Sequence, residues 1–159
     1  MRKALMAFFL LFSFNSYGAG AKIDIPKYDW SWKGFFGTYD RASAQRGLKV
    51  YREVCAGCHS MNYLAYRNLG DLGFSEDHIK AIAAEHLILD GPDDEGEMFE
   101  RDGIPSDQFA NPYPNVQAAR AANNGAYPPD LSLIVKARPK GADYVKALLL
   151  GYVDPPEDM

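Results

Sequence analysis

The chain has 159 residues, of which 47% are hydrophobic and 24% are charged, and its formal net charge is −4 at pH 7. This length suffices for one domain, or one domain behind a leader, and the many glycines and prolines favour short helices joined by long loops. The acidic balance argues against nucleic acid and anionic membrane surfaces as partners, and it suits a basic protein partner.

The first residues have the pattern of a secretory signal peptide. A basic pair precedes an apolar run from Ala4 to Phe14, and Ser16-Tyr17-Gly18 follows with small residues at the two positions that a signal peptidase recognises. This order is typical of an exported protein, so we predict a signal peptide at residues 1–18, with cleavage one or two residues later as the alternative. The apolar run is shorter than the roughly 20 residues that span a bilayer, which disfavours an uncleaved membrane anchor. Residues 19–159 are then expected to fold in a bacterial periplasm.

An aromatic arm and a helix are expected next. Residues 22–39 are rich in aromatic side chains but contain proline and glycine. We therefore expect an irregular arm laid over the core, whose Trp and Phe side chains supply buried area. A helix is predicted over 40–54, capped by Asp40 or Ser43. Its apolar face is expected to comprise Gly47, Leu48, Tyr51 and Val54.

The remaining pattern predicts a mainly α-helical domain with short helices and long loops. A second helix is predicted over 75–89, with a serine cap at its start. Closely spaced prolines predict loop from 91 to 132, interrupted by one short helix at 116–122. A last helix is predicted over 142–152, and no segment shows the alternation typical of a half-buried strand.

An acidic run, DGPDDEGEMFERD, covers residues 90–102 and holds seven carboxylates and one arginine. Such a run usually forms a solvated, flexible loop. The functional alternative is a docking surface for a partner of opposite charge.

The only cysteines of the chain, Cys55 and Cys58, lie in the sequence VCAGCHS, directly before His59. The spacing C-x-x-C-H is the attachment signal for haem c. Two thiols at this spacing can form thioether bonds to the vinyl groups of one haem, and the next residue offers its imidazole to the iron. We therefore predict one covalently bound haem c, with His59 as the metal ligand.

Three other interpretations of the cysteine pair are weaker. A thioredoxin-like motif requires a strand before it and a helix after it, whereas a helix is predicted before this one. A structural zinc site requires four ligands, and the chain has no second cysteine pair. A disulfide is possible in an oxidising compartment, but it leaves the adjacent histidine unexplained.

The sequence offers no convincing sixth iron ligand. Met61 is too close to the histidine of the motif to reach the opposite face of the haem, Met98 lies in the acidic run, and Met159 is the last residue. His86 is on the apolar stripe of its predicted helix, where a lone histidine is more often part of the core than a ligand.

Four segments, in this order, resemble the cytochrome c1 family: RGLKVYREVCAGCHSMNYLAYRNL, DGPDDEGEMFERDG, NPYPNVQAARAANNGAYPPDLSLI and GADYVKALLLGYVDPP. Members of this family are the haem-bearing subunits of ubiquinol–cytochrome c oxidoreductase in bacteria and mitochondria. The match covers nearly the whole chain after the leader. The segment AARAANNGAYPPDLS is more specific than the C-x-x-C-H motif, which identifies only a haem c protein.

The resemblance implies a cytochrome c-like fold and an electron path from a Rieske iron–sulfur protein to a soluble basic cytochrome c. It implies cytochrome b as a further partner and a position on the periplasmic side of the bacterial inner membrane. It assigns thioether bonds to the two cysteines, the fifth iron ligand to the histidine, a propionate ion pair to the arginine and the pocket wall to the prolines. These residues are Cys55, Cys58, His59, Arg120, Pro128 and Pro129.

The sequence departs from the family at its end. Members continue beyond the segment that resembles GYVDPPEDM, with a methionine ligand, a further helix and a membrane anchor. We therefore expect the haem domain at 19–159 to be C-terminally incomplete and weakly folded alone, with a five-coordinate iron or a non-native sixth ligand. An electron-transfer subunit, not an enzyme on its own, is the leading interpretation. A free periplasmic cytochrome c and a gas sensor or enzyme with an open iron site are the alternatives.

Overall fold

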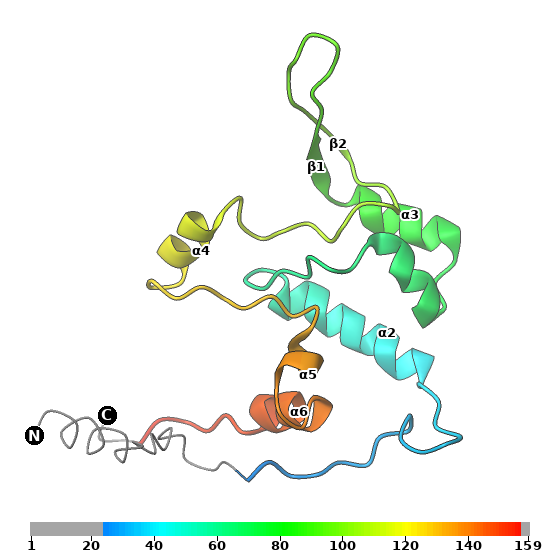
Figure 1. Ribbon diagram of the computed structural model, residues 1–159, viewed down its shortest axis with the longest axis vertical. Coiled ribbons are helices and arrows are strands. Elements are labelled where there is room, and N and C mark those ends of the chain that lie inside the picture. Colours follow the sequence, from blue (N-terminus) through cyan, green and yellow to red (C-terminus); the bar gives the residue numbers. More distant parts are fainter. Residues whose placement is uncertain (1–23, 157–159) are drawn as a thin grey trace, which may run out of the picture.

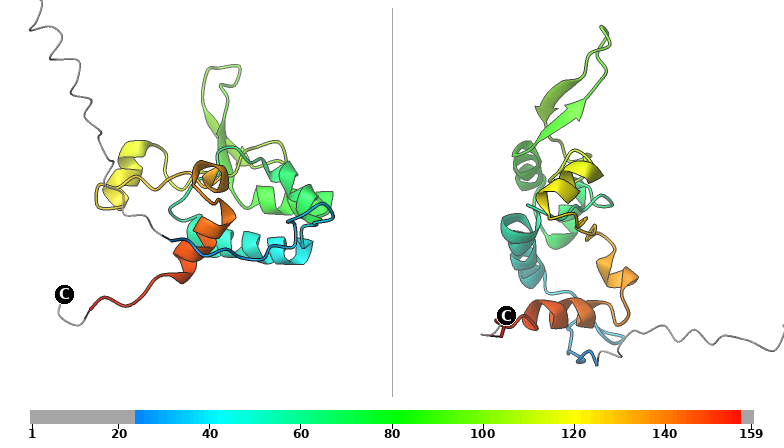
Figure 2. Two further views of the ribbon diagram at one scale, coloured as in Figure 1. Left: turned by 60° about the horizontal axis from the view of Figure 1, so that its bottom comes forward. Right: turned by 90° about the vertical axis from the view of Figure 1, so that its left-hand side faces the viewer.

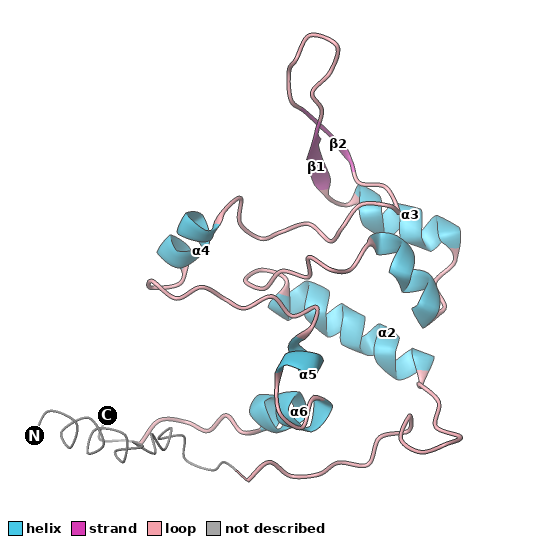
Figure 3. Ribbon diagram, in the orientation of Figure 1, coloured by secondary structure: helices cyan, strands magenta, loops and turns pink. Residues whose placement is uncertain are grey.

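The computed structural model describes residues 24–156, so the predicted signal peptide lies outside the described residues. Short helices and long loops dominate these residues (Figures 1 and 3), and the predicted mainly α class is confirmed. The helical elements are α2 (Arg41–Val50), a π-helical turn (Tyr51–Cys55), a 3₁₀ helix (Tyr66–Leu72), α3 (Glu76–Ala84), α4 (Val116–Ala122), α5 (Ile134–Ala137) and α6 (Ala142–Leu150). The strands β1 (Leu87–Asp90) and β2 (Phe99–Asp102) form an antiparallel hairpin.

The helix predicted over 40–54 is present, but its last turn is wider than an α-helix. The Asp40 carboxylate accepts a hydrogen bond from the Ser43 amide at 3.1 Å, as the cap prediction requires. Beyond Val50 the backbone widens into the π-helical turn, where the Ala56 amide donates to the Tyr51 carbonyl at 2.7 Å. The wider turn changes the angular spacing of the side chains, so the predicted apolar face is wrong at Val54, which is 72% exposed. It is also wrong at Gly47, which is exposed on α2 and has open space around it.

The hydrophobic core lies where the π-helical turn, the 3₁₀ helix and α3 meet. Tyr66 is its most buried large side chain, at 1% exposed, and its ring stacks on Phe109 with the centroids 4.7 Å apart. The Tyr66 hydroxyl accepts a hydrogen bond from the Ala110 amide, so burial leaves the polar end of this side chain partnered. The buried cluster comprises Tyr51, Tyr66, Leu69, Ile79, Ile82, Ala83 and Phe109.

The helix predicted over 75–89 ends early, and the expectation of no strands is wrong. Ser75 caps α3 by accepting from the His78 amide, but the helix stops at Ala84. Beyond the end of α3, the segment that follows β2 packs against the chain, and the Gly103 amide donates to the His86 carbonyl at 2.9 Å. A Cβ at Gly103 would lie 2.5 Å from the Ala83 carbonyl oxygen, so only glycine allows this approach.

The hairpin that follows projects away from the rest of the molecule (Figure 2). Its strands pair from Leu87 with Asp102 to Asp90 with Phe99. The predicted burial of His86 is also wrong, because this side chain is exposed at the foot of the hairpin and stacks on the Tyr66 ring with the centroids 6.0 Å apart.

The N-terminal arm is irregular, as predicted, but it lies along α6 (Figure 1) rather than over the core, to which its described residues contribute no side chain. The Tyr28 amide and the Trp30 indole both donate to one carboxylate oxygen of Asp143 on α6, at 3.2 and 2.6 Å. The prediction that its Phe side chains are buried is wrong, since Phe35 and Phe36 are 95% and 90% exposed. They are the central residues of a turn closed by the Gly37 amide and the Gly34 carbonyl, which directs their side chains outward.

The C-terminal part matches the predictions more closely. The short helix predicted at 116–122 is α4, with the same bounds, and the Asn115 side chain caps it by accepting from the Ala118 amide. The last predicted helix is α6, which ends at Leu150 rather than at residue 152. The four-residue helix α5 was not predicted.

Candidate functional site

The Cys-Ala-Gly-Cys-His sequence follows the π-helical turn directly. The amides of Cys58 and His59 both donate to the Cys55 carbonyl, at 3.1 and 2.8 Å, so the motif closes into one tight turn. Both cysteines are free thiols; Cys55 is half-buried and Cys58 is exposed. The preceding element is helical, unlike the strand that precedes a thioredoxin motif. This geometry leaves two thiols and one imidazole available at a single turn.

The ring of His59 is held in one orientation by the chain far downstream. Its Nδ1 atom lies 2.8 Å from the Pro129 carbonyl oxygen. A carbonyl oxygen only accepts hydrogen bonds, so Nδ1 carries the proton and Nε2 keeps the lone pair that a metal ligand needs. The histidine is thus already in the tautomer suited to binding iron through Nε2.

The backbone of the same histidine is held by Tyr51. The buried Tyr51 hydroxyl donates to the His59 carbonyl at 3.1 Å. Burial, together with the nearby charge of Asp130, raises the pKa of Tyr51 to about 12. The hydroxyl therefore stays protonated, and remains a donor, throughout the physiological pH range.

Asp130 ties the segment after the prolines to the segment after the motif. One of its carboxylate oxygens accepts from the Ser60 hydroxyl and the Asn62 amide, both at 2.8 Å. The other accepts from the Ser132 amide at 2.8 Å. Burial by itself opposes ionisation of this group, but the hydrogen bonds from Asn62, Ser132 and Ser60 outweigh it and lower the pKa of Asp130. The carboxylate is therefore charged and fully engaged at neutral pH.

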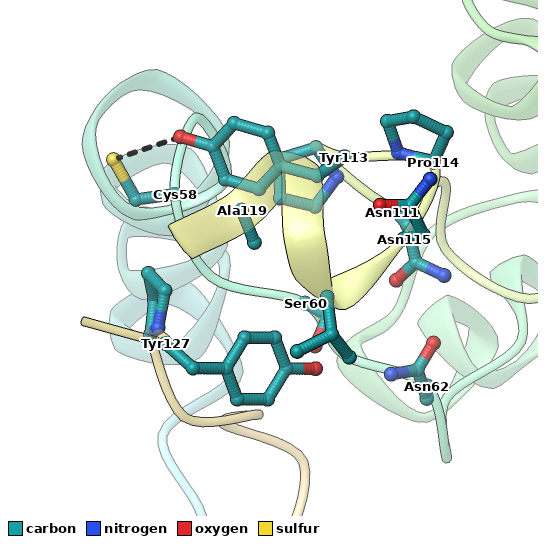
Figure 4. Close-up of a pocket in the computed structure, with 12 residues that line it drawn as sticks. Cys58, Ser60, Asn62, Asn111, Tyr113, Pro114, Asn115, Ala119 and Tyr127 are labelled. Carbon is teal, nitrogen blue, oxygen red and sulfur yellow. Dashed lines mark hydrogen bonds between the residues drawn. The ribbon is translucent and has the colours of Figure 1, made fainter. Parts of the chain in front are cut away.

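A small open cavity of about 130 Å³ lies beside Cys58 (Figure 4). The Tyr113 hydroxyl points at the Cys58 sulfur from 3.9 Å, and the Asn123 side chain donates to the same hydroxyl at 3.2 Å. Ligand pockets usually measure roughly 300–1,000 Å³, so these walls would cover one edge of a large planar group. A Cβ at Gly57 would meet open space, which leaves room for such an edge next to the thiols. The residues present therefore fit an attached haem.

The two prolines and the arginine assigned by the resemblance lie at different positions around the C-x-x-C-H turn and on α4. Pro128 lines the cavity beside Cys58, and Pro129 contributes the carbonyl that holds the histidine ring. Arg120 is exposed on α4, and its guanidinium donates to the Gly125 carbonyl at 2.8 Å, which closes the loop after the helix. Its pairing with a haem propionate stays a prediction.

Sequence reasoning missed Asp130, Tyr113 and the role of Tyr51. Asp130 and Tyr113 lie inside the segments that carry the resemblance, each beside a proline, but residue type alone does not reveal partners that are 70 and 55 positions away. Their importance depends on contacts that only the folded chain provides. Of the methionines considered as iron ligands, Met61 packs against the core and Met98 is 54% exposed on the hairpin. Met159 lies outside the described residues.

The acidic run is the second charged feature of the molecule. Every residue from 91 to 100 is exposed, including the carboxylates at the tip. At the base, the Arg101 guanidinium donates to Asp90 at 2.5 Å and to Asp107 at 2.6 and 3.0 Å. These hydrogen bonds hold the pKa values of Asp90 and Asp107 below the usual range. The acidic tip is thus carried on a hairpin whose base is fixed by one arginine.

Between residues 24 and 156, no helix combines the length and the apolar character needed to cross a bilayer. The same residues contain no cluster of three or more His, Cys, Asp and Glu side chains arranged to hold a metal ion.

Comparison with known proteins gives one consistent family. The model of the Cytochrome C1 family matches residues 30–159. Cytochrome c1 of Rhodospirillum rubrum is 56% identical over 130 residues, which cover 82% of this chain and 48% of that protein. The potato protein "Cytochrome c1-2, heme protein, mitochondrial" is 55% identical over 84% of this chain and 52% of its own length. The Candida albicans "Cytochrome b-c1 complex catalytic subunit, mitochondrial" is 54% identical over 82% of this chain and 46% of its own length. The chain spans about half the length of the curated relatives it matches.

Proposed function

The chain belongs to the cytochrome c1 family, and on that basis we propose that it is the haem c electron-transfer subunit of a ubiquinol–cytochrome c oxidoreductase. In this role it accepts electrons from a Rieske iron–sulfur protein and passes them to a soluble cytochrome c. The chain is then not a catalyst by itself, because the quinol chemistry takes place on other subunits.

The observation that carries the proposal is the state of the C-x-x-C-H turn. Two free thiols and an imidazole with an available Nε2 are presented together, next to an open cavity. Cys55 and Cys58 supply the thioether sulfurs and His59 the iron ligand, in line with the chemistry of the motif. When bound, haem c supplies a one-electron redox centre.

The protein holds the redox centre rather than reacting with substrate. Pro128 and Tyr113 cover one edge of the attachment site. Arg120 is the proposed partner of a haem propionate, since a guanidinium can hold a carboxylate through two hydrogen bonds. Covalent attachment and a fixed histidine keep the distance and orientation of the haem constant, which suits repeated electron transfer.

The acidic hairpin is the proposed contact for a basic soluble cytochrome c. Its exposed carboxylates stand clear of the body of the molecule (Figure 2), so a basic protein can approach them without contacting the core. Complementary charge accelerates the encounter of two proteins more than it strengthens the final complex. Fast, reversible docking of this kind suits a carrier that must leave after each electron.

The proposed location is the periplasmic side of a bacterial inner membrane, in a complex with cytochrome b and the Rieske protein. Export by the predicted signal peptide at 1–18 would place the chain in the compartment where haem c is attached.

The proposal is tested by expressing the full-length gene with an affinity tag in a bacterium that attaches haem c. We expect cytochrome b and a Rieske protein to co-purify, and the complex to reduce a basic cytochrome c when ubiquinol is added. A tagged chain that carries haem c but purifies alone would contradict membership of the complex. The matched control is the Cys55→Ser, Cys58→Ser variant, which cannot attach haem through its thiols.

A further inference from the structure

The segment that holds the His59 ring has no regular secondary structure of its own. Residues 126–130 are loop, and the Pro129 carbonyl that contacts His59 belongs to this loop. A loop carbonyl can hold a ring at 2.8 Å only if neighbouring residues fix the loop. The described contacts identify Asp130, the next residue, as the main attachment.

Asp130 makes three hydrogen bonds, and two of them reach residues about seventy positions earlier in the chain. It binds the Ser60 hydroxyl and the Asn62 amide on one side, and the Ser132 amide on the other. Two further contacts run parallel to these: the Leu131 amide donates to the Ser60 carbonyl at 2.9 Å, and the Tyr63 amide donates to the Ser132 hydroxyl at 3.0 Å. We call this set of contacts the Asp130 latch.

The latch fixes both ends of one short hydrogen-bonded ring. Asp130 directly follows Pro129, whose carbonyl accepts from the ring of His59, and Ser60 directly follows His59. A carboxylate that binds Ser60 therefore sets how closely the Pro129 carbonyl approaches Nδ1. Because Ser60 is buried at 8% exposed, water does not readily replace this contact.

We propose that Asp130 is a positioning residue that controls how strongly the His59 imidazole donates electrons to the haem iron. A hydrogen bond from Nδ1–H to a carbonyl makes the imidazole a stronger base at Nε2, and second-shell partners of this kind tune bound metals. A stronger base stabilises the ferric state more than the ferrous state, so the intact latch keeps the reduction potential low. The inference rests on the proposed haem c function.

The test compares the reduction potential of four variants of the full-length chain, purified in its complex after haem attachment. Asp130→Ala removes the latch, and Asp130→Asn keeps one acceptor oxygen but loses the charge. Ser60→Ala removes one of the three bonds. Asp71→Asn is the control, because Asp71 is an exposed carboxylate on the 3₁₀ helix, outside the latch.

We expect the potential to shift in the positive direction, most for Asp130→Ala, less for Asp130→Asn, least for Ser60→Ala, and not at all for the control. Solvent exchange of the His59 Nδ1–H proton, followed by nitrogen-15 NMR, should become about tenfold faster or more in Asp130→Ala, since hydrogen bonds to a charged group are lost. If Asp130→Ala takes up no haem, the two milder variants carry the same test.

A merely structural Asp130 would lower the yield of haem protein and leave the potential and the exchange rate of the remaining haem protein unchanged. That result would overturn the inference while leaving the proposed function intact. A parent chain without covalent haem would overturn the proposed function, and this inference with it.

Discussion

Residues 58–66 are tied to distant parts of the chain, whereas residues 91–100 contact mainly one another. The first segment binds Asp130 and Leu131 through Ser60, and the Tyr66 amide donates to the Asp107 carbonyl at 3.0 Å. In the second segment the Asp93 carboxylate accepts from the amides of Glu95 and Glu97, so the hairpin tip closes on itself.

This difference matches the work proposed for the two regions. A haem attachment site must hold a metal ligand in one orientation, which long-range hydrogen bonds and a buried aromatic core provide. A docking surface must present charge to a partner and release it again, which an exposed hairpin on a fixed base provides. The contrast predicts that substitutions in one region should leave the other largely unaffected, except where they remove the shared core.

Removal of the Tyr66 side chain should have the largest effect, because this residue supports both regions. Tyr66→Ala deletes a ring that is 1% exposed and stacked on Phe109, and large aromatic deletions in cores cost about 3–5 kcal/mol. The free energy of unfolding from urea titration measures this cost. Tyr63→Ala is the matched control, since Tyr63 is 73% exposed. Equal losses in the two variants would contradict the position of the core.

Acid should loosen the haem region through Asp130. The pKa of Asp130 is lowered in the folded chain, so its carboxylate stabilises the fold above the unfolded value of about 3.9. That stabilisation is lost as the pH falls through the lower folded value. Urea midpoints measured as a function of pH should therefore fall on acidification, and more gently for Asp130→Asn. Parallel pH profiles for the two proteins would show that the latch does not stabilise the fold.

Loss of Arg101 should release the hairpin and spare the haem region. Arg101→Met leaves Asp90 and Asp107 without their shared cation, whereas Arg101→Lys keeps the charge but not the paired geometry. Amide hydrogen exchange should become faster over residues 87–102, more for Met than for Lys, and stay unchanged over 58–66. Faster exchange in both segments would mean that the two regions are mechanically coupled.

Tyr51→Phe should have a smaller effect, confined to the haem region. The variant removes one hydrogen bond to the His59 carbonyl and keeps the ring in the core. The expected loss is about 0.5–1.5 kcal/mol in the free energy of unfolding. Thermal unfolding of the parent and the variant measures it, and a loss as large as that of Tyr66→Ala would show that the hydroxyl has a further partner.

Single charges at the hairpin tip should have the smallest effect. Neutralising Asp94 or Glu95 removes one exposed charge. An exposed ion pair contributes about 0.2–1 kcal/mol of interaction free energy, so the loss should be of this size. The association rate with a basic soluble cytochrome c should fall by a few-fold at low salt, and the difference should vanish at high salt. Asp71→Asn, the same change outside the hairpin, provides the control. An effect that persists at high salt would contradict a purely electrostatic contact.

Features with a local signal were predicted correctly from the sequence. The caps at Asp40 and Ser75, the helix at 116–122 and the C-x-x-C-H turn all depend on residues close together in the chain. The hairpin was missed because β1 forms only when β2 returns beside it, at a point that requires Gly103. The orientation of Phe35 and Phe36 depends on a single turn whose direction composition does not reveal.

The site followed the same division. Cys55, Cys58 and His59 were predicted as haem-binding residues from their spacing and chemistry, and the structure places all three on one turn; their binding of haem stays a prediction. The residues that orient the histidine, Asp130 and Tyr51, were not identified, because their hydrogen bonds join the motif to other parts of the fold. The sequence thus predicts a local motif, but it does not reveal the distant residues whose hydrogen bonds hold that motif in place.

The intact mass of the full-length chain under denaturing conditions tests the central claim most directly. After expression in a host that attaches haem c, we predict a mass increase equal to one haem, together with red colour that survives denaturation. The Cys55→Ser, Cys58→Ser variant should show neither. A parent chain with the mass of the bare polypeptide, despite active haem attachment in that host, would contradict the account.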